Sequence, residues 1–152
     1  MADRFFDTSA TVKHYLPETG TAKVDTLLAD VGARHFLSDL GVVELQSVFA
    51  RQVRTGQITP ADFALFRGRF LADIASGLWT VLPVTGGDFH IAQQLLARHG
   101  LTRSLRTLDA IQLAVAVARH ATSPLHAFVC ADLNLNHVSA LEGLAVVNPE
   151  IP

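Results

Sequence analysis

Two apolar runs in the sequence end on an aspartate, a residue type able to bind metal or move protons. Arg4–Phe6 leads into Asp7, and Ala127–Ala131 leads into Asp132. Short apolar runs of this kind are typical of buried strands in a parallel sheet. Ligands of parallel sheets bind outside the carboxyl ends of the strands, so we expect both carboxylates at one rim.

Two further carboxylates lie within the apolar faces of expected helices. Glu44 shares its expected face with residues at three- and four-residue spacing, namely Leu40, Val43, Ser47 and Val48. Asp109 lies within a similar face made by Leu105, Leu108, Gln112, Leu113 and Ala116. Burying an ionised carboxylate without compensation costs on the order of several kcal/mol, so each needs a cation, a proton or a metal. We find no comparable set of inward-facing Lys or Arg, which favours a divalent metal.

The ligand types indicate which metal and which reaction to expect. Carboxylate oxygens suit Mg²⁺ or Mn²⁺, whereas zinc sites more usually recruit His or Cys. The seven histidines form no His-x-His or His-x-x-x-His pair. A metal held by carboxylates can activate water and stabilise charge on a phosphodiester, which favours phosphodiester hydrolysis. Each acid taken alone could equally be a helix cap or half of an ion pair. Asp7, for example, could accept hydrogen bonds from the backbone N–H groups of the residues that follow it.

The elements that must position these residues alternate between short apolar runs and longer helical patterns. Strands are expected at Arg4–Phe6, His35–Leu37, Trp79–Leu82, Ala127–Ala131 and Ala145–Val147. Helices are expected at Ser9–Tyr15, Thr21–Asp30, Asp39–Arg54, Pro60–Ala75, Gly87–His99, Arg106–His120 and Leu135–Leu141. This alternation predicts an α/β fold, a three-layer sandwich in which helices cover both faces of a central, mostly parallel sheet.

Length and composition favour a single domain over residues 1–152. Hydrophobic residues make up 49% of the chain and charged residues 17%, and no stretch is long and apolar enough to span a membrane. The start lacks the pattern of a signal peptide. The single cysteine, Cys130, is typical of a small core residue in a reducing compartment. We therefore expect a cytoplasmic protein.

The net charge of −2 does not by itself predict nucleic-acid binding. Divalent cations could reverse the sign at an acidic site, and small basic clusters could hold phosphates. Two arginine pairs near the predicted acids are candidate RNA contacts: Arg51 with Arg54, and Arg103 with Arg106. Lys13 and His14, on the helix after the first acid, could flank the same groove, although a plain surface histidine is the favoured interpretation for His14. Solvated charges near helix ends are the alternative interpretation for all of them.

Four segments carry a further signal, in this order: FFDTSATVKHYLPE, LSDLGVVELQSVFAR, LRTLDAIQLAVA and FVCADLNL. They resemble the PIN domain family, and within it the VapC-type toxins of toxin–antitoxin modules, over essentially the whole chain. The acids of the family pattern fall on the four carboxylates already selected, Asp7, Glu44, Asp109 and Asp132. Thr8 and Ser9 match a hydroxyl residue that is common just after the first acid. Cys130 stands where a second Ser or Thr is common, which could alter how the last acid is oriented.

The resemblance implies an endoribonuclease that depends on Mg²⁺ or Mn²⁺, acts as a toxin, and is inhibited by an antitoxin occupying the acidic groove. It also implies a homodimer. Asp7, Glu44 and Asp109 would be the principal metal ligands, and Asp132 would bind a second ion or position the attacking water. Thr8 would support these ligands through its hydroxyl or its backbone.

Other functions remain as alternatives. A phosphatase of the haloacid dehalogenase type needs an aspartate two residues after the first acid, where this chain has Ser9. No Gly-x-x-x-x-Gly-Lys occurs, which argues against a nucleotide-binding P-loop. The rival from another class is a non-catalytic PIN-like module that binds RNA or protein. Among enzymes, the rival is a PIN nuclease acting on DNA or on a structured substrate.

The expected helix Pro60–Ala75 is the segment we select for a dimer or antitoxin contact. It carries three phenylalanines at helical spacing, Phe63, Phe66 and Phe70. This spacing predicts core or interface packing rather than stacking on bases.

Overall fold

Five strands and seven helices alternate along the chain in the computed structural model, which describes residues Met1–Pro152. The strands are β1 (Ala2–Phe6), β2 (Ala33–Ser38), β3 (Thr80–Leu82), β4 (Ala127–Val129) and β5 (Val146–Val147). The helices are α1 (Thr8–Tyr15), α2 (Thr21–Leu28), α3 (Asp39–Arg54), α4 (Pro60–Ala75), α5 (Gly86–His99), α6 (Thr107–Thr122) and α7 (Leu133–Leu141). Every element expected from the sequence is present, with its ends within two residues of the expected positions.

The strands form one sheet in the order β3-β2-β1-β4-β5, and every neighbouring pair is parallel. The sequence predicted a mostly parallel sheet, and the sheet is entirely parallel. β1 lies in the middle, where Phe5 pairs with Phe36 of β2 and with Phe128 of β4. The chain adds strands first on one side of β1 and then on the other. Asp7 and Asp132 follow β1 and β4, at the point where the strand order reverses and such sheets bind ligands.

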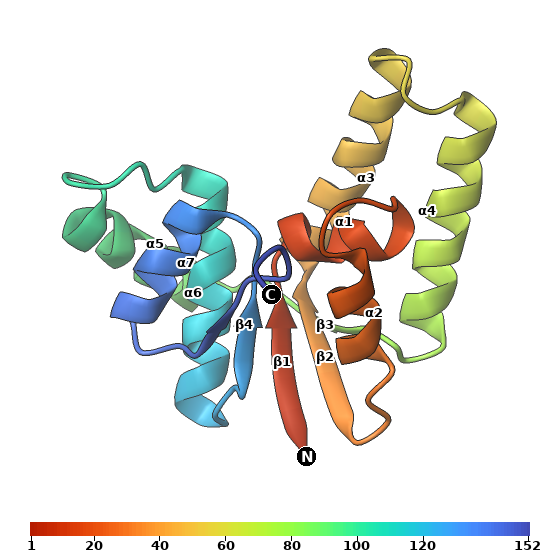
Figure 1. Ribbon diagram of the computed structural model, residues 1–152. Helices are drawn as coiled ribbons and strands as arrows, with labels where there is room; N and C mark the ends of the chain where they lie inside the picture. The colour runs from red at the N-terminus through yellow and green to blue at the C-terminus, as the bar shows by residue number, and fades with distance from the viewer.

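Helices cover both faces of this sheet, which confirms the three-layer sandwich (Figure 1). Helices α1 to α4 lie on one face, and α5, α6 and α7 lie on the other. Successive strand residues point to opposite faces, so Phe5 and Phe128 join a buried cluster with α5 and α6. Phe6 and Val129 join a second cluster with Trp79 on the opposite face. These two cores fix the strand ends that carry the acids.

Helices α3 and α4 form a hairpin that extends beyond the sheet (Figure 1). The Thr59 side chain and Asp62 cap the start of α4 reciprocally, with proline in the first turn. Phe70 is fully buried, and Phe63 and Phe66 pack against the same cluster. Core packing therefore accounts for the aromatic residues of α4, and they no longer support this helix as a docking surface.

The predicted inward face of α3 is wrong. Its buried residues are Gly41, Leu45 and Phe49. Val43 is 64% exposed and Ser47 is also exposed. Apolar residues occupy so many positions at the start of this helix that the sequence allows more than one buried face. Glu44 consequently lies half-buried at the edge of the core, and in α6 Leu108 is likewise 47% exposed although it was expected to be buried.

Candidate active site

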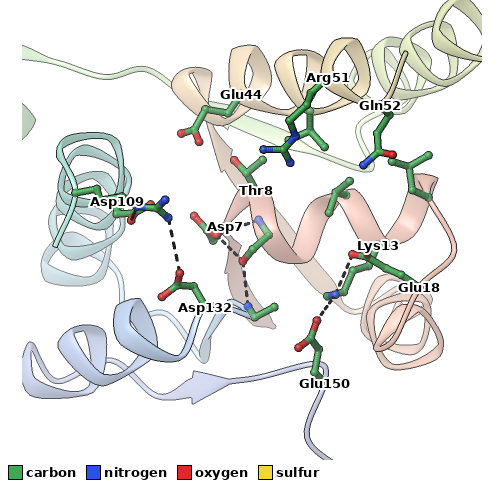
Figure 2. A pocket seen from close by; sticks show the side chains of 16 residues that line it. Asp7, Thr8, Lys13, Glu18, Glu44, Arg51, Gln52, Asp109, Asp132 and Glu150 are labelled. Carbon is green, nitrogen blue, oxygen red and sulfur yellow. Dashed lines mark hydrogen bonds and ion pairs between the residues drawn. The ribbon is translucent and has the colours of Figure 1, made fainter. Parts of the chain in front are cut away.

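A cavity of about 420 Å³ opens at the carboxyl rim of the sheet (Figure 2). All four carboxylates selected from the sequence line it: Asp7, Glu44, Asp109 and Asp132. Asp7 and Asp132 follow β1 and β4, Glu44 comes from the second turn of α3, and Asp109 comes from the first turn of α6. Thr8 lines the same cavity. Four segments far apart in the chain therefore contribute acids to one space.

Asp7 is the most buried of the four acids, at 5% exposure. Its Oδ2 accepts hydrogen bonds from the Ser9 backbone N–H at 3.0 Å and from Ser9 Oγ at 2.6 Å. Burial raises the pKa of Asp7, the Ser9 hydrogen bonds oppose this rise, and the charge of Asp109 adds to it. Asp7 is thus a helix cap, as the alternative interpretation proposed. The cap uses one oxygen and leaves Oδ1 without a protein donor.

Asp132 and Asp109 share one arginine. Asp132 caps α7 by accepting the Leu135 N–H at 2.8 Å through Oδ1, and its Oδ2 lies 3.8 Å from Arg106 Nη2. Asp109 Oδ2 accepts from Arg106 Nε at 3.1 Å. The expectation that no cation would face the acids is therefore wrong for these two. The Arg106 side chain is 73% exposed, so solvent screens both pairs and they contribute at most about 1 kcal/mol.

Gln112 binds Glu44 and Thr8, whereas the sequence pattern predicted only packing for this residue. Its side chain is buried, and its Nε2 donates to Glu44 Oε1 at 2.9 Å and to Thr8 Oγ1 at 2.8 Å. Its Oε1 accepts from Ser38 Oγ at 3.1 Å. Burial raises the pKa of Glu44, the bond from Gln112 opposes this, and the charges of Asp7 and Asp109 add to it. The sequence does contain a signal for this role, because Gln112 places an amide one turn after Asp109 among the apolar residues of the same helix.

Cys130 lies in the core beside Asp7, rather than against the carboxylate of Asp132. Its Sγ is 3.7 Å from Asp7 Oδ2 and 3.7 Å from the Asp132 carbonyl oxygen. Ser9 Oγ accepts the Ala131 N–H at 3.0 Å, so this serine joins the end of β4 to Asp7. Ser9 therefore provides a hydroxyl group next to position 130. Cys130 packs beside Asp7 without displacing Asp7 or Asp132 from the cavity.

The carboxylates surround the cavity without converging on one point. No group of three Asp, Glu, His or Cys side chains is close enough to form a metal-binding cluster. Each acid nonetheless has one oxygen held by the protein, while no protein donor contacts Asp7 Oδ1, Glu44 Oε2 or Asp109 Oδ1. Mg²⁺ keeps several waters and uses one or two carboxylates directly. This oxygen-only set, spread around a cavity of about 420 Å³, fits a hydrated divalent ion.

The four candidate RNA-binding arginines divide into two groups. Arg51 and Arg106 line the cavity, and Arg51 points into it from α3 (Figure 2). Arg54 and Arg103 do not line it. Arg54 lies farther along the hairpin that leaves the sheet, and Arg103 precedes the first turn of α6, so neither reaches the acids.

Lys13 lines the opposite end of the cavity, as the sequence suggested. Two glutamates there were missed, Glu18 and Glu150, and both bond Lys13. Glu150 follows the last strand and lies 137 residues from Lys13 in the chain. A pairing over that separation leaves no local pattern in the sequence.

The family model of the PIN domain matches residues 4–141 of the chain. Among solved structures, FitAcB from Neisseria gonorrhoeae is 21% identical, with 98% of this chain and 99% of that chain covered and a TM-score of 0.69. VapC20 from Mycobacterium tuberculosis, described as a sarcin–ricin loop cleaving toxin, is 19% identical, with 96% and 99% covered and a TM-score of 0.68. VapBC2 from Rickettsia felis, bound to a promoter DNA fragment, is 14% identical, with 96% and 98% covered and a TM-score of 0.62.

No curated protein sequence matches the chain. At these identities, the similarity to solved structures shows a shared fold. The family model extends over most of the chain and confirms the resemblance of the four sequence segments. The chain belongs to the PIN domain family.

Proposed function

We propose that this protein is an endoribonuclease that hydrolyses RNA phosphodiesters with Mg²⁺ or Mn²⁺ and acts as the toxin of a toxin–antitoxin pair. One observation carries the proposal. Four carboxylates from four separate segments line one cavity, and two of them, Asp7 and Glu44, form no ion pair. Burial raises the pKa of both groups, so a bound divalent ion would relieve a real electrostatic penalty.

The residues divide into three roles. Asp7, Glu44 and Asp109 would hold the ion through their uncontacted oxygens, and Asp132 would hold a second ion or orient the attacking water. When bound, the ion supplies charge neutralisation and Lewis acidity for phosphodiester hydrolysis. Thr8 supports the set because its hydroxyl and Glu44 accept from the same amide. Arg51 and Arg106 would contact backbone phosphates beside the acids, and Arg54 and Arg103 are no longer proposed for this role.

Membership of the PIN domain family supports a nuclease, and similar structures support the toxin assignment. VapC20 is described as cleaving the sarcin–ricin loop, and FitAB and VapBC2 are described as complexes with DNA fragments. By the same analogy we propose a protein antitoxin that inhibits the enzyme by occupying the acidic groove. Two alternative functions remain: a nuclease acting on DNA or on a structured substrate, and a binding module without catalysis. The assays below distinguish them from the proposed ribonuclease.

We also propose a homodimer of one-domain chains, each comprising residues 1–152, acting in the cytoplasm. Val43 of α3 and Phe89 of α5 are 64% and 51% exposed and line one apolar hollow, which a second copy would cover. No helix of the structure is long and apolar enough to cross a bilayer. Light scattering on wild type and Val43→Asp measures the assembly. The proposal expects a dimer that the substitution weakens, and a monomeric wild type at micromolar concentration would contradict it.

Cleavage of labelled RNA by the purified protein tests the central function. With Mn²⁺ or Mg²⁺ the wild type is expected to cut, and EDTA or Asp7→Asn is expected to abolish cutting. Single-stranded and duplex DNA of the same sequence serve as parallel substrates. RNA binding without cleavage under every metal condition would contradict the enzyme, and preferential DNA cleavage would contradict the choice of substrate.

A further inference from the structure

A lysine is buried at the end of the cavity away from the four acids. The Lys13 side chain is 3% exposed, and its Nζ donates to Glu18 Oε1 at 2.9 Å and to Glu150 Oε1 at 2.6 Å (Figure 2). All three residues line the cavity. The two glutamate side chains are nearly half exposed, at 46% and 43%. The Lys13 ammonium is therefore enclosed, whereas the two carboxylates that bind it are exposed to solvent. Another anion could replace either carboxylate at the ammonium.

Residues 148–152, here termed the strap, follow β5 and lie against the turn between α1 and α2. Lys23 Nζ donates to the strap carbonyl of Ile151 at 2.8 Å. Gly20, at φ +94°, permits the close approach, since a Cβ there would lie 3.0 Å from the strap backbone. These contacts hold Glu150 over the ammonium, and they involve few groups.

One face of α1 connects the lysine to the acids. The residues of this face that line the cavity are Ser9, Val12 and Lys13, and Leu16 lines it directly after the helix ends. Ser9 holds Asp7 by two hydrogen bonds, and Lys13 lies one turn farther along, about 6 Å in the direction of the helix axis. A nucleic-acid strand that crosses the acids and follows α1 would bring a neighbouring phosphate to the lysine.

We infer that Lys13 is a backbone-phosphate site of the groove, masked in the free protein by Glu150 and exposed when a nucleic-acid phosphate replaces that carboxylate. The inference rests on the proposed function. In this exchange Nζ keeps Glu18 and swaps one anionic oxygen for another, so the enclosed ammonium is never left without a counter-charge. Because carboxylate and phosphate compete for the same donor, Glu150 lowers the affinity of the free protein for nucleic acid.

Fluorescence anisotropy with a labelled, mixed-sequence single-stranded RNA, in EDTA to prevent cleavage, tests this exchange. Glu150→Gln is expected to tighten binding about threefold to tenfold and to leave the dependence of log affinity on log salt unchanged, because the wild type makes the same phosphate contact once Glu150 is displaced. Adding Lys13→Met to Glu150→Gln is expected to reverse the gain and to make the salt dependence shallower by about 0.7, the increment for one phosphate contact on a single strand. Glu142→Gln is the matched control, because Glu142 pairs with Arg98 and His99 and does not line the cavity.

Two results would overturn the inference. One is an unchanged affinity in Glu150→Gln. The other is an equal gain from Glu150→Gln in the Lys13→Met background, which would indicate general repulsion by the carboxylate. If Lys13→Met does not fold, Glu18→Gln decides, because general repulsion predicts the same gain in affinity from either glutamate, whereas the exchange predicts a gain from Glu150→Gln only. Failure of the proposed function is a separate result, since it appears as absent cleavage by the wild type with Mn²⁺.

Discussion

Strand β1 has a buried aspartate at each end, and the two have opposite surroundings. Asp3, 2% exposed, accepts two hydrogen bonds from Arg34 at 2.8 and 2.7 Å and one from Arg119 at 2.6 Å. The Arg34 bonds, together with the charges of both arginines, outweigh burial and lower the pKa of Asp3. Asp7, 5% exposed, contacts no arginine or lysine, and burial raises its pKa. A buried acid with its own cations holds the fold, whereas one without them is available to an external cation.

The two ends of the sheet differ because different groups surround them. At the end with Asp3, the last turn of α6 supplies Arg119 and β2 supplies Arg34. At the other end α1 and α7 begin, and their first turns offer backbone N–H groups to the acids. Such N–H groups provide only partial positive charge. At this rim the backbone groups therefore orient Asp7 without neutralising it, and only the exposed Arg106 faces Asp109 and Asp132.

The largest expected effect separates the two aspartates in activity. Asp7→Asn is expected to reduce RNA cleavage about a thousandfold or more, because it removes charge from the metal-holding set. Asp3→Asn is expected to leave the turnover of folded protein within a fewfold of wild type. Single-turnover rates, corrected for the folded fraction, measure both. Equal losses in the two variants would break the comparison.

The second-largest expected effect is a difference in stability between the Asp3→Asn and Asp7→Asn variants. Asp3→Asn is expected to lower the free energy of unfolding by about 2–4 kcal/mol, because it leaves two arginines without their shared carboxylate. Asp7→Asn is expected to be neutral or stabilising in EDTA, because it removes a buried charge that has no cation. Urea unfolding of the wild type, Asp3→Asn and Asp7→Asn measures the free energies of unfolding. A strongly destabilised Asp7→Asn would assign Asp7 a structural role instead.

The pH dependence of stability is expected to have opposite signs at the two sites. The raised pKa of Asp7 makes its contribution largest below pH 3.8 and declining as the pH rises through the folded pKa. The lowered pKa of Asp3 makes its contribution present above pH 3.8 and lost as the pH falls through the folded pKa. In EDTA, Asp7→Asn should therefore flatten the stability profile above pH 3.8. Asp3→Asn should flatten it in acid, and a common shape for both variants would contradict the assignment.

The smallest expected effect compares two arginines of α3. Arg51 lines the acidic cavity and Arg54 does not. Arg51→Gln is expected to weaken RNA binding about fivefold and to reduce the salt dependence by about 0.7, as for one lost phosphate contact. Arg54→Gln is the matched control and should change neither quantity. If Arg54→Gln has the larger effect in anisotropy titrations, the strand follows a different route across the protein.

The sequence predicted the features that depend on local pattern. Every strand and helix was placed from apolar periodicity, and the positions of Asp7 and Asp132 followed from strands that end at one rim. The buried face of α3 was misplaced, because consecutive apolar residues such as Val42 and Val43 allow more than one face. The hydrogen bonds of Gln112 with Thr8 and of Lys13 with Glu150 were not predicted, because their partners lie 104 and 137 residues apart in the chain. Such partners are decided by tertiary packing, which local spacing does not encode.

Direct binding of Mn²⁺ is the measurement that tests the central claim, that the rim acids form a site for a divalent ion. Titration of the protein, followed by loss of the free-ion EPR signal, requires no substrate and no partner. The account predicts saturable binding by the wild type and by Asp3→Asn, and an affinity at least about tenfold weaker in Asp7→Asn. No saturable binding by the wild type, or equal affinity in Asp7→Asn, would contradict it.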